Sequence, residues 1–384
     1  MTQNQSGGTE AGAPDPEADS DPGPPAPGPG ILDIAAYVPG SSQVPGLNRS
    51  YKLSSNEAAL GASPAAIEAY QALAGELHRY PDGGAVALRQ ALAAHFGIAA
   101  ERIVCGDGSD ELLGLLVSAY AGPGDEVLYS RHGFVVYKIA ALGVGATPLT
   151  APEQDYTADV DALLEMVNER TRIVFLSNPN CTGTYITADE VRRLHAGLPS
   201  NVLFVVDSAY AEFVGAEDYS AGLELVGAAE NVVMTRTFSK AYGLAALRLG
   251  WCYGPAAVID VLNRVRGPFN VTAPAQAAGI AALGDQEFLE RARRHNDQWR
   301  PWLENEAKAL GFRVIPSVAN FVMVGSRDGG AADDLNRHLI GRGVLVRGMG
   351  GYGLGDFLRV SVGSEEETRA VLEALASYPA SNPD

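Results

Sequence analysis

Between about residues 62 and 265 the sequence alternates helix-period stretches with short apolar runs, and this alternation limits the possible folds more than any other feature. Two of the helical stretches span residues 64–75 and 84–96. The apolar runs, each bounded by turn residues, span residues 126–129, 172–176, 202–206 and 231–235. Runs that are apolar on both faces are typical of parallel strands buried under helices. The sequence therefore predicts an α/β domain with a mostly parallel sheet sandwiched by helices.

The pattern changes after about residue 270. A long helical stretch, about 273–310, leads into short strands at 313–315, 320–324, 344–347 and 357–362. This α+β pattern predicts a second, smaller domain. We therefore divide the chain into a large domain (62–269) and a small C-terminal domain (270–384). Residues 31–61 form an N-terminal arm that belongs in part to the small domain.

The first thirty residues differ in composition from the rest of the chain. They contain seven Pro, six Gly and five acidic residues, and neither Lys nor Arg. A segment with so little to bury cannot offset its loss of conformational entropy, so we expect residues 1–30 to be a disordered tail. The tail also lacks the basic start and apolar core of a signal peptide.

The charge and the cysteines exclude several classes of function. Acidic residues outnumber basic ones 46 to 28, for a net charge of -18. Such a charge disfavours nucleic-acid partners and anionic membrane surfaces, and no apolar run is long enough to predict a membrane span. The three cysteines are far apart, with no Cys-x-x-Cys pair, which argues against disulfides and against a metal site. We expect a cytoplasmic protein without a metal.

Polar residues follow several predicted strands, and in parallel sheets ligands bind beyond the carboxyl ends of the strands. The groups are Asp207 and Tyr210; Thr237, Ser239, Lys240 and Arg248; Gly108, Ser109 and Asp110, which open a helix; Asn178 and Asn180; and His132 and Phe134. Taken singly, each group has an ordinary explanation. A Gly-Ser-Asp sequence before a helix is commonly an N-cap, and a lone Asp after a strand is commonly a turn residue.

Taken together, these residues fit one ligand. A lysine in a dry site can lose its proton and form a Schiff base. A carboxylate at a strand end can keep a pyridine nitrogen protonated, so that the ring accepts electrons. Helix N-terminal amides with Ser, Thr and Arg side chains neutralise a phosphate. The ligand that needs all three is pyridoxal 5'-phosphate.

The sequence that contains these residues resembles the fold-type I pyridoxal-phosphate aminotransferases, and among them the histidinol-phosphate aminotransferases. The resemblance covers about residues 31–377. Its strongest passages are residues 31–40 (ILDIAAYVPG), 51–57 (YKLSSNE), 205–213 (VVDSAYAEF), 236–251 (RTFSKAYGLAALRLGW) and 358–363 (LRVSVG). It implies a homodimer with its active site at the interface, where the segment beginning at Asn56 and Glu57 reaches toward the neighbouring subunit's cofactor.

The resemblance also implies roles for single residues. Lys240 would form the Schiff base and move the proton, Asp207 would pair with the pyridine nitrogen, and Tyr210 and Asn180 would donate to the ring hydroxyl. Phe134 would stack on the ring. The phosphate cup would comprise Gly108, Ser109, Asp110, Thr237, Ser239 and Arg248. The substrate-site residues would be Tyr37, Arg347 and Arg359. For Phe134 and Tyr37, simple packing is the alternative.

Three positions depart from the family pattern. Leu60 stands where many relatives have a Tyr, and Ser208 stands where Glu commonly follows the aspartate. The third departure lies in the loop after residue 176, which reads Asn180-Cys181-Thr182-Gly183 instead of Asn-Pro-Thr-Gly and is one residue short. The role of Asn180 therefore has an alternative candidate in Asn178.

The resemblance implies transamination between histidinol phosphate or imidazole-acetol phosphate and glutamate or 2-oxoglutarate, in histidine biosynthesis. An aromatic aminotransferase for phenylalanine or tyrosine is the alternative, because Arg347 and Arg359 suit a phosphate or a carboxylate equally. A decarboxylase on the same scaffold is a further alternative. A non-catalytic cofactor binder is disfavoured, because it would not need the pair of Lys240 and Asp207.

Overall fold

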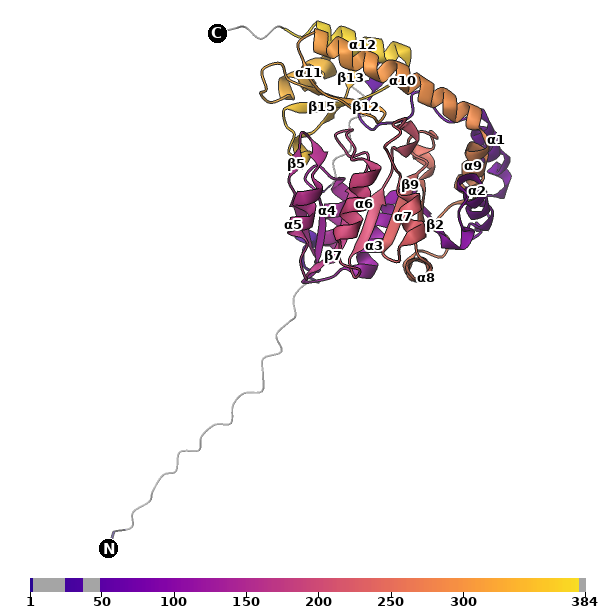
Figure 1. Ribbon diagram of the computed structural model, residues 1–384, viewed down its shortest axis with the longest axis vertical. Helices are drawn as coiled ribbons and strands as arrows, with labels where there is room; N and C mark the ends of the chain where they lie inside the picture. Colours follow the sequence, from indigo (N-terminus) through magenta and orange to yellow (C-terminus); the bar gives the residue numbers. More distant parts are fainter. Residues whose placement is uncertain (3–24, 37–48, 380–384) are drawn as a thin grey trace.

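Two sheets organise the chain in the computed structural model, which describes residues 1–2, 25–36 and 49–379 (Figure 1). Most of the predicted tail lies outside these residues, and so does Tyr37. The last residue of the predicted tail is packed, because a Cβ on Gly30 would lie 2.5 Å from the Leu142 carbonyl oxygen. Gly30 also has a φ of 82°, a conformation that favours glycine.

The larger sheet has seven strands in the order β2-β10-β9-β8-β7-β3-β4. Their bounds are β2 (Ile103–Asp107), β10 (Leu249–Tyr253), β9 (Val232–Thr237), β8 (Leu203–Asp207), β7 (Thr171–Ser177), β3 (Glu126–Ser130) and β4 (Thr147–Ala151). Every neighbouring pair is parallel except the two pairs made by β10, which runs antiparallel to β2 and β9. The predicted α/β fold with a mostly parallel sheet is confirmed.

Helices cover both faces of this sheet, which is why its strands are apolar at nearly every position. In β8, for example, Phe204 and Val206 face one hydrophobic cluster while Leu203 and Val205 face the other. One face packs on α3 (Gly108–Tyr120), α4 (Val135–Gly143) and α8 (Ala256–Val265). The other packs on α1 (Pro64–Ala72), α2 (Val86–Phe96), α5 (Val160–Met166), α6 (Ala188–Gly197), α7 (Leu223–Ala228) and α9 (Ala273–Gly284).

The C-terminal region differs from expectation in two places. The predicted helical stretch from 273 to 310 is two helices, α9 and α10 (Gln286–Ala309), because Asp285 ends the first and its side chain accepts a hydrogen bond from the Phe288 amide of the second. The predicted strand at 344–347 is likewise divided into two strands, β13 (Val344–Leu345) and β14 (Arg347–Gly348). These two strands belong to different sheets.

The four-stranded sheet has the order β11-β12-β15-β14 and is antiparallel throughout. Its remaining strands are β11 (Arg313–Ile315), β12 (Phe321–Gly325) and β15 (Phe357–Ser361), and its helices are α10, α11 (Asp333–Gly341) and α12 (Glu365–Ala376). Figure 1 shows this sheet above the carboxyl ends of the large sheet, with α10 crossing from the small sheet toward α9 and α1.

The N-terminal arm is attached to the small sheet region. Strand β1 (Tyr51–Lys52) pairs in parallel with β13, and the Leu53 carbonyl accepts a hydrogen bond from the Ser361 amide. The residues after Leu53 are thereby held beside the end of β15. Across the described ranges, no helix has the length and apolar character that a bilayer crossing needs.

Candidate functional site

A cavity of about 180 Å³ lies where β7, β8 and β9 end, and its wall includes residues of β14 and β15 from the small sheet. The structure brings most of the residues singled out in the sequence to this cavity. Those that line it are Ser109, Asp110, Phe134, Asp207, Tyr210, Thr237, Ser239, Lys240, Arg248, Arg347 and Arg359. Their convergence follows from the parallel sheet, since the carboxyl ends of neighbouring parallel strands meet at one edge.

Asp207, the last residue of β8, is a buried carboxylate on the cavity wall. Its Oδ2 accepts a hydrogen bond from the Tyr137 hydroxyl at 2.7 Å, and its Oδ1 accepts one from Thr235 Oγ1 at 3.0 Å. Burial raises the pKa of Asp207 to about 6, although both hydrogen bonds act in the opposite direction. The carboxylate is thus charged at neutral pH and is held in one orientation.

Lys240 also lines the cavity, from the segment that follows β9. Its Nζ donates to the Ser55 carbonyl oxygen at 3.1 Å and lies 5.6 Å from the centre of the Tyr210 ring. Burial, and then the positive charge of Arg359, lower the pKa of Lys240 to about 8. A substantial fraction of the amine is therefore neutral near physiological pH, as a nucleophile requires.

Tyr210 is fixed by the N-terminal arm of the same chain. Its hydroxyl accepts a hydrogen bond from Asn56 Nδ2 at 2.9 Å, and the Asn56 amide donates to Ser361 Oγ at 2.7 Å. Burial raises the pKa of Tyr210 to about 12, so the hydroxyl keeps its proton and can donate it to a ligand in the cavity. The Asn56 side chain thus contacts a cavity residue of its own chain, while Glu57 is ion-paired with Lys52.

One end of the cavity is built to hold an anion. Ser109 lies in the first turn of α3, where free backbone amides favour negative charge. Arg248 Nη1 lies 3.2 Å from Ser239 Oγ, and Arg248 Nη2 lies 3.2 Å from an Asp110 carboxylate oxygen. Gly108 does not line the cavity itself, but its φ of 75° favours glycine, and a Cβ there would lie 2.3 Å from Arg248 Nη2 and would displace the guanidinium.

Two further arginines line the cavity from the small sheet. Arg347 of β14 and Arg359 of β15 are direct register partners in the antiparallel pair, and both line the cavity with Tyr352. This second concentration of positive charge suits an anionic group of a substrate.

The loop after β7 differs from expectation. Asn180 does not line the cavity, because its Nδ2 faces a Glu153 carboxylate oxygen (3.4 Å) and the Tyr156 carbonyl oxygen (3.3 Å). The alternative candidate, Asn178, is also turned away. Its Nδ2 donates to the Ile186 carbonyl oxygen, and its Oδ1 accepts from the Ile186 backbone amide. The loop residue that lines the cavity is Cys181, whose thiol is buried and whose pKa is raised by burial to about 11.

Sequence reasoning missed the two residues that hold Asp207. Thr235 lies opposite Asp207 in the β8–β9 register, and its signal was a hydroxyl at the end of the run 231–235. Tyr137 lies one turn after Phe134 on α4, and its ring stacks on Phe175 with the centroids 4.4 Å apart. Ser54, Ser55, Ser177 and Ala209 also line the cavity and were not predicted. Within the described part of the chain, no group of three or more His, Cys, Asp or Glu side chains could hold a metal ion.

A buried ion pair joins the segments that carry the acid and the lysine. Arg236 Nη2 lies 2.7 Å from Glu212 Oε1, and neither side chain is more than 8% exposed. Glu212 follows Tyr210, and Arg236 precedes Thr237, so the pair connects the two strand ends behind the cavity. The Arg236 guanidinium also lies 4.9 Å from the centre of the Phe96 ring. Removal of either charge would leave the other buried without a partner, which is strongly destabilising.

Known proteins similar to this chain are aminotransferases. Residues 49–375 match the family described as aminotransferase class I and II. The chain is 58% identical to the histidinol-phosphate aminotransferase of Paramagnetospirillum magneticum over 355 residues, 91% of this chain and 97% of that protein. It is 56% identical to the Rhodospirillum centenum enzyme of the same name, with the same two coverages.

A solved structure agrees with the sequence comparisons. The histidinol-phosphate aminotransferase of Sinorhizobium meliloti, in complex with pyridoxal-5'-phosphate, superimposes with a TM-score of 0.81 at 30% identity. The match covers 86% of this chain and 91% of that one. Because the family match extends over most of the sequence and includes every residue that lines the cavity, this chain belongs to the aminotransferase class I and II family.

Proposed function

We propose that this protein uses pyridoxal 5'-phosphate to transfer an amino group between histidinol phosphate and 2-oxoglutarate, a reaction of histidine biosynthesis. The observation that carries the proposal is one cavity in which Lys240 and a buried Asp207 lie beside an anion-binding helix end. Two relatives more than half identical to this chain, both named histidinol-phosphate aminotransferase, support the choice of substrate.

The residues around the cavity fit this cofactor. Pyridoxal phosphate, when bound, supplies an aldehyde for attachment of amines and a ring that accepts electrons from the substrate carbon. Its phosphate would lie at the start of α3, with Ser109, Ser239 and Arg248 as ligands. Asp207 would keep the ring nitrogen protonated, Tyr210 would donate to the ring hydroxyl, and Phe134 would cover a ring face.

The remaining residues would act on the substrate. Lys240 would hold the cofactor and would move the proton taken from the substrate carbon that bears the amine. Its lowered pKa suits this role, because a base works best when its pKa is near the operating pH. Arg347 and Arg359 would bind the phosphate of histidinol phosphate, or the carboxylate of glutamate in the second half of the reaction.

The substrate is tested by single half-reactions. The protein in its aldehyde form is mixed with histidinol phosphate, phenylalanine or tyrosine, and the loss of cofactor absorbance is followed. We expect histidinol phosphate to react with the highest kcat/KM, by about tenfold or more, because its phosphate makes charge-assisted hydrogen bonds to arginine that are worth about 1.5–3 kcal/mol. Faster reaction of phenylalanine or tyrosine would instead indicate an aromatic aminotransferase, and no conversion with glutamate would favour a decarboxylase.

Lys240 is expected to be the residue that carries the cofactor. Borohydride reduction of the loaded protein should attach the cofactor covalently to Lys240, and Lys240→Ala should still bind it but give no reducible linkage. In the ligand-free protein, the rate of covalent capture should rise with pH through about 8, since the neutral amine is the nucleophile. Peptide mapping that finds the label on another lysine would refute the assignment.

Asp207→Asn is expected to preserve the fold and to lower kcat by more than tenfold, or about 1.4 kcal/mol. The amide retains the hydrogen-bonding shape but loses the charge that keeps the ring nitrogen protonated. Tyr137→Phe is the control, since it removes one hydrogen bond to the carboxylate and leaves the charge. Equal losses in the two variants, with unchanged melting temperatures, would contradict a role for the charge.

We further propose a homodimer, located in the cytoplasm. The dimer is supported by the family resemblance and by large apolar side chains exposed around α1 and the segments beside it: Leu60, Ile67, Tyr70, Leu77, Tyr80 and Phe269. The Tyr80 and Phe269 rings stack with their centroids 4.6 Å apart. The cytoplasmic location is supported by three cysteines that are all free and buried.

The dimer is tested by substitution of an exposed leucine. Leu77→Asp should shift the protein toward monomer in sedimentation velocity experiments and lower its activity at nanomolar concentration. Leu32→Asp is the matched control, because Leu32 is the same residue type and is even more exposed (85% against 73%) but lies in a segment that contacts α4. A wild-type protein that sediments as a monomer with full activity would overturn the dimer.

A further inference from the structure

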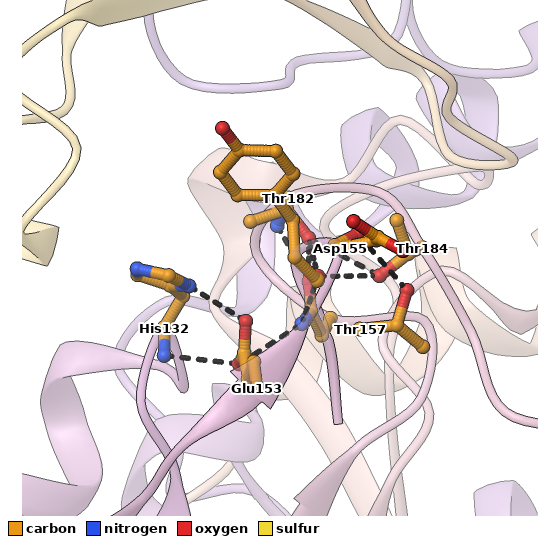
Figure 2. Close-up of polar contacts among 8 residues, drawn as sticks. His132, Glu153, Asp155, Thr157, Thr182 and Thr184 are labelled. Atoms are coloured by element: carbon orange, nitrogen blue, oxygen red, sulfur yellow. Dashed lines mark hydrogen bonds and ion pairs between the residues drawn. The ribbon is translucent and has the colours of Figure 1, made fainter. Parts of the chain in front are cut away.

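A buried carboxylate outside the cavity is bonded to two of the loops that form its wall. Glu153, in β5 (Glu153–Gln154), has a side chain that is only 2% exposed. Its Oε2 lies 2.6 Å from His132 Nδ1, and its Oε1 accepts from the His132 amide at 3.1 Å and faces Asn180 Nδ2 at 3.4 Å. Figure 2 shows Glu153 between His132 and the loop that carries Thr182 and Thr184. A buried carboxylate is costly unless such partners surround it.

Each partner of Glu153 is close in sequence to a cavity residue. His132 is two residues before Phe134, in the loop from β3 to α4, and Asn180 immediately precedes Cys181, in the loop after β7. Phe134 and Cys181 both line the cavity, whereas Glu153 does not. The carboxylate therefore connects two walls of the cavity from behind.

The turn after Glu153 reinforces the same connection. The Tyr156 carbonyl oxygen accepts hydrogen bonds from Thr182 Oγ1 and Thr184 Oγ1, each at 2.8 Å. Asp155 and Tyr156 reach this position with φ angles of 46° and 63°, in the left-handed region that residues other than glycine seldom adopt. Such a conformation persists only where surrounding contacts hold it.

The turn also contacts the small sheet. The Tyr156 ring packs edge-on against Phe357 of β15, with the centroids 5.5 Å apart, and Arg359 lies two residues farther along that strand. The hairpin of β5 and β6 (Thr157–Ala158) is thus in contact with three segments that contribute cavity residues.

We propose that Glu153 is a positioning residue for the cofactor cavity, because its bonds to His132 and Asn180 fix the spacing between the walls that carry Phe134 and Cys181. The inference rests on the proposed assignment of this cavity to pyridoxal phosphate. It concerns residues that do not touch the cofactor, so its effect reaches the ligand only through the two loops.

The test compares Glu153→Ala with Glu126→Ala. Glu126 is a matched control: its side chain is 5% exposed and is bonded to Arg170 and Asn168, but it lies at the opposite end of β3. Three quantities are measured: the Kd of pyridoxal phosphate for the ligand-free protein, the visible circular dichroism of the loaded protein, and the melting temperature without ligand.

We expect Glu153→Ala to raise the Kd about tenfold or more and to reduce the circular dichroism of the cofactor, because the ring loses its fixed orientation. Glu126→Ala should lower the melting temperature and leave the Kd within about twofold of wild type. Glu153→Gln should be intermediate, since its amide oxygen still accepts from the His132 amide and from Asn180.

Two results would overturn the positioning role. One is a Glu153→Ala variant that behaves like Glu126→Ala, with a lower melting temperature but a wild-type Kd and dichroism. The second result applies if the alanine variant does not fold. It is a Glu153→Gln variant whose Kd and circular dichroism are those of wild type. A wild-type protein that binds no pyridoxal phosphate would instead overturn the proposed function, and the positioning role with it.

Discussion

A carboxylate buried at the end of a strand is costly unless it is hydrogen-bonded, and in this protein that requirement links two strands of the large sheet with a helix. Asp207 belongs to β8, Thr235 donates to it from β9, and Tyr137 donates from α4. The same helix begins after Phe134, so this cavity residue and Asp207 are both joined to α4.

The charge near the cavity differs in sign from that of the whole protein. The chain carries a net charge of -18, yet Lys240, Arg248, Arg347 and Arg359 all line a single cavity. Separation of positive charge from the acidic surface lets the protein bind small anions while its overall field still repels polyanions. The three arginines come from different parts of the chain: Arg248 lies beside α3, and Arg347 and Arg359 lie on the small sheet.

Sequence reasoning located the ends of β3, β7, β8 and β9 and most cavity residues because both depend on local patterns. Apolar runs predict parallel strands, and polar residues after them predict the site. It failed where the outcome depends on contacts distant in sequence: Asn180 is turned away because Glu153 and Tyr156 accept its amide, and Tyr137 is significant only because α4 packs beside β8. The antiparallel β10 was missed because LGWCY, with its glycine, is a weak strand signal. The division of the chain at residues 62 and 270 stays a prediction.

The attachment of β1 to β13 and β15 has a consequence for biosynthesis. Ser54, Ser55 and Asn56 form one wall of the cavity region and are held there by contacts with residues between 344 and 361. A chain emerging from the ribosome completes all seven strands of the large sheet by residue 253, about a hundred residues before those contacts exist. The large sheet can thus assemble during translation, whereas the binding site stays open on one side until nearly the whole polypeptide has been made.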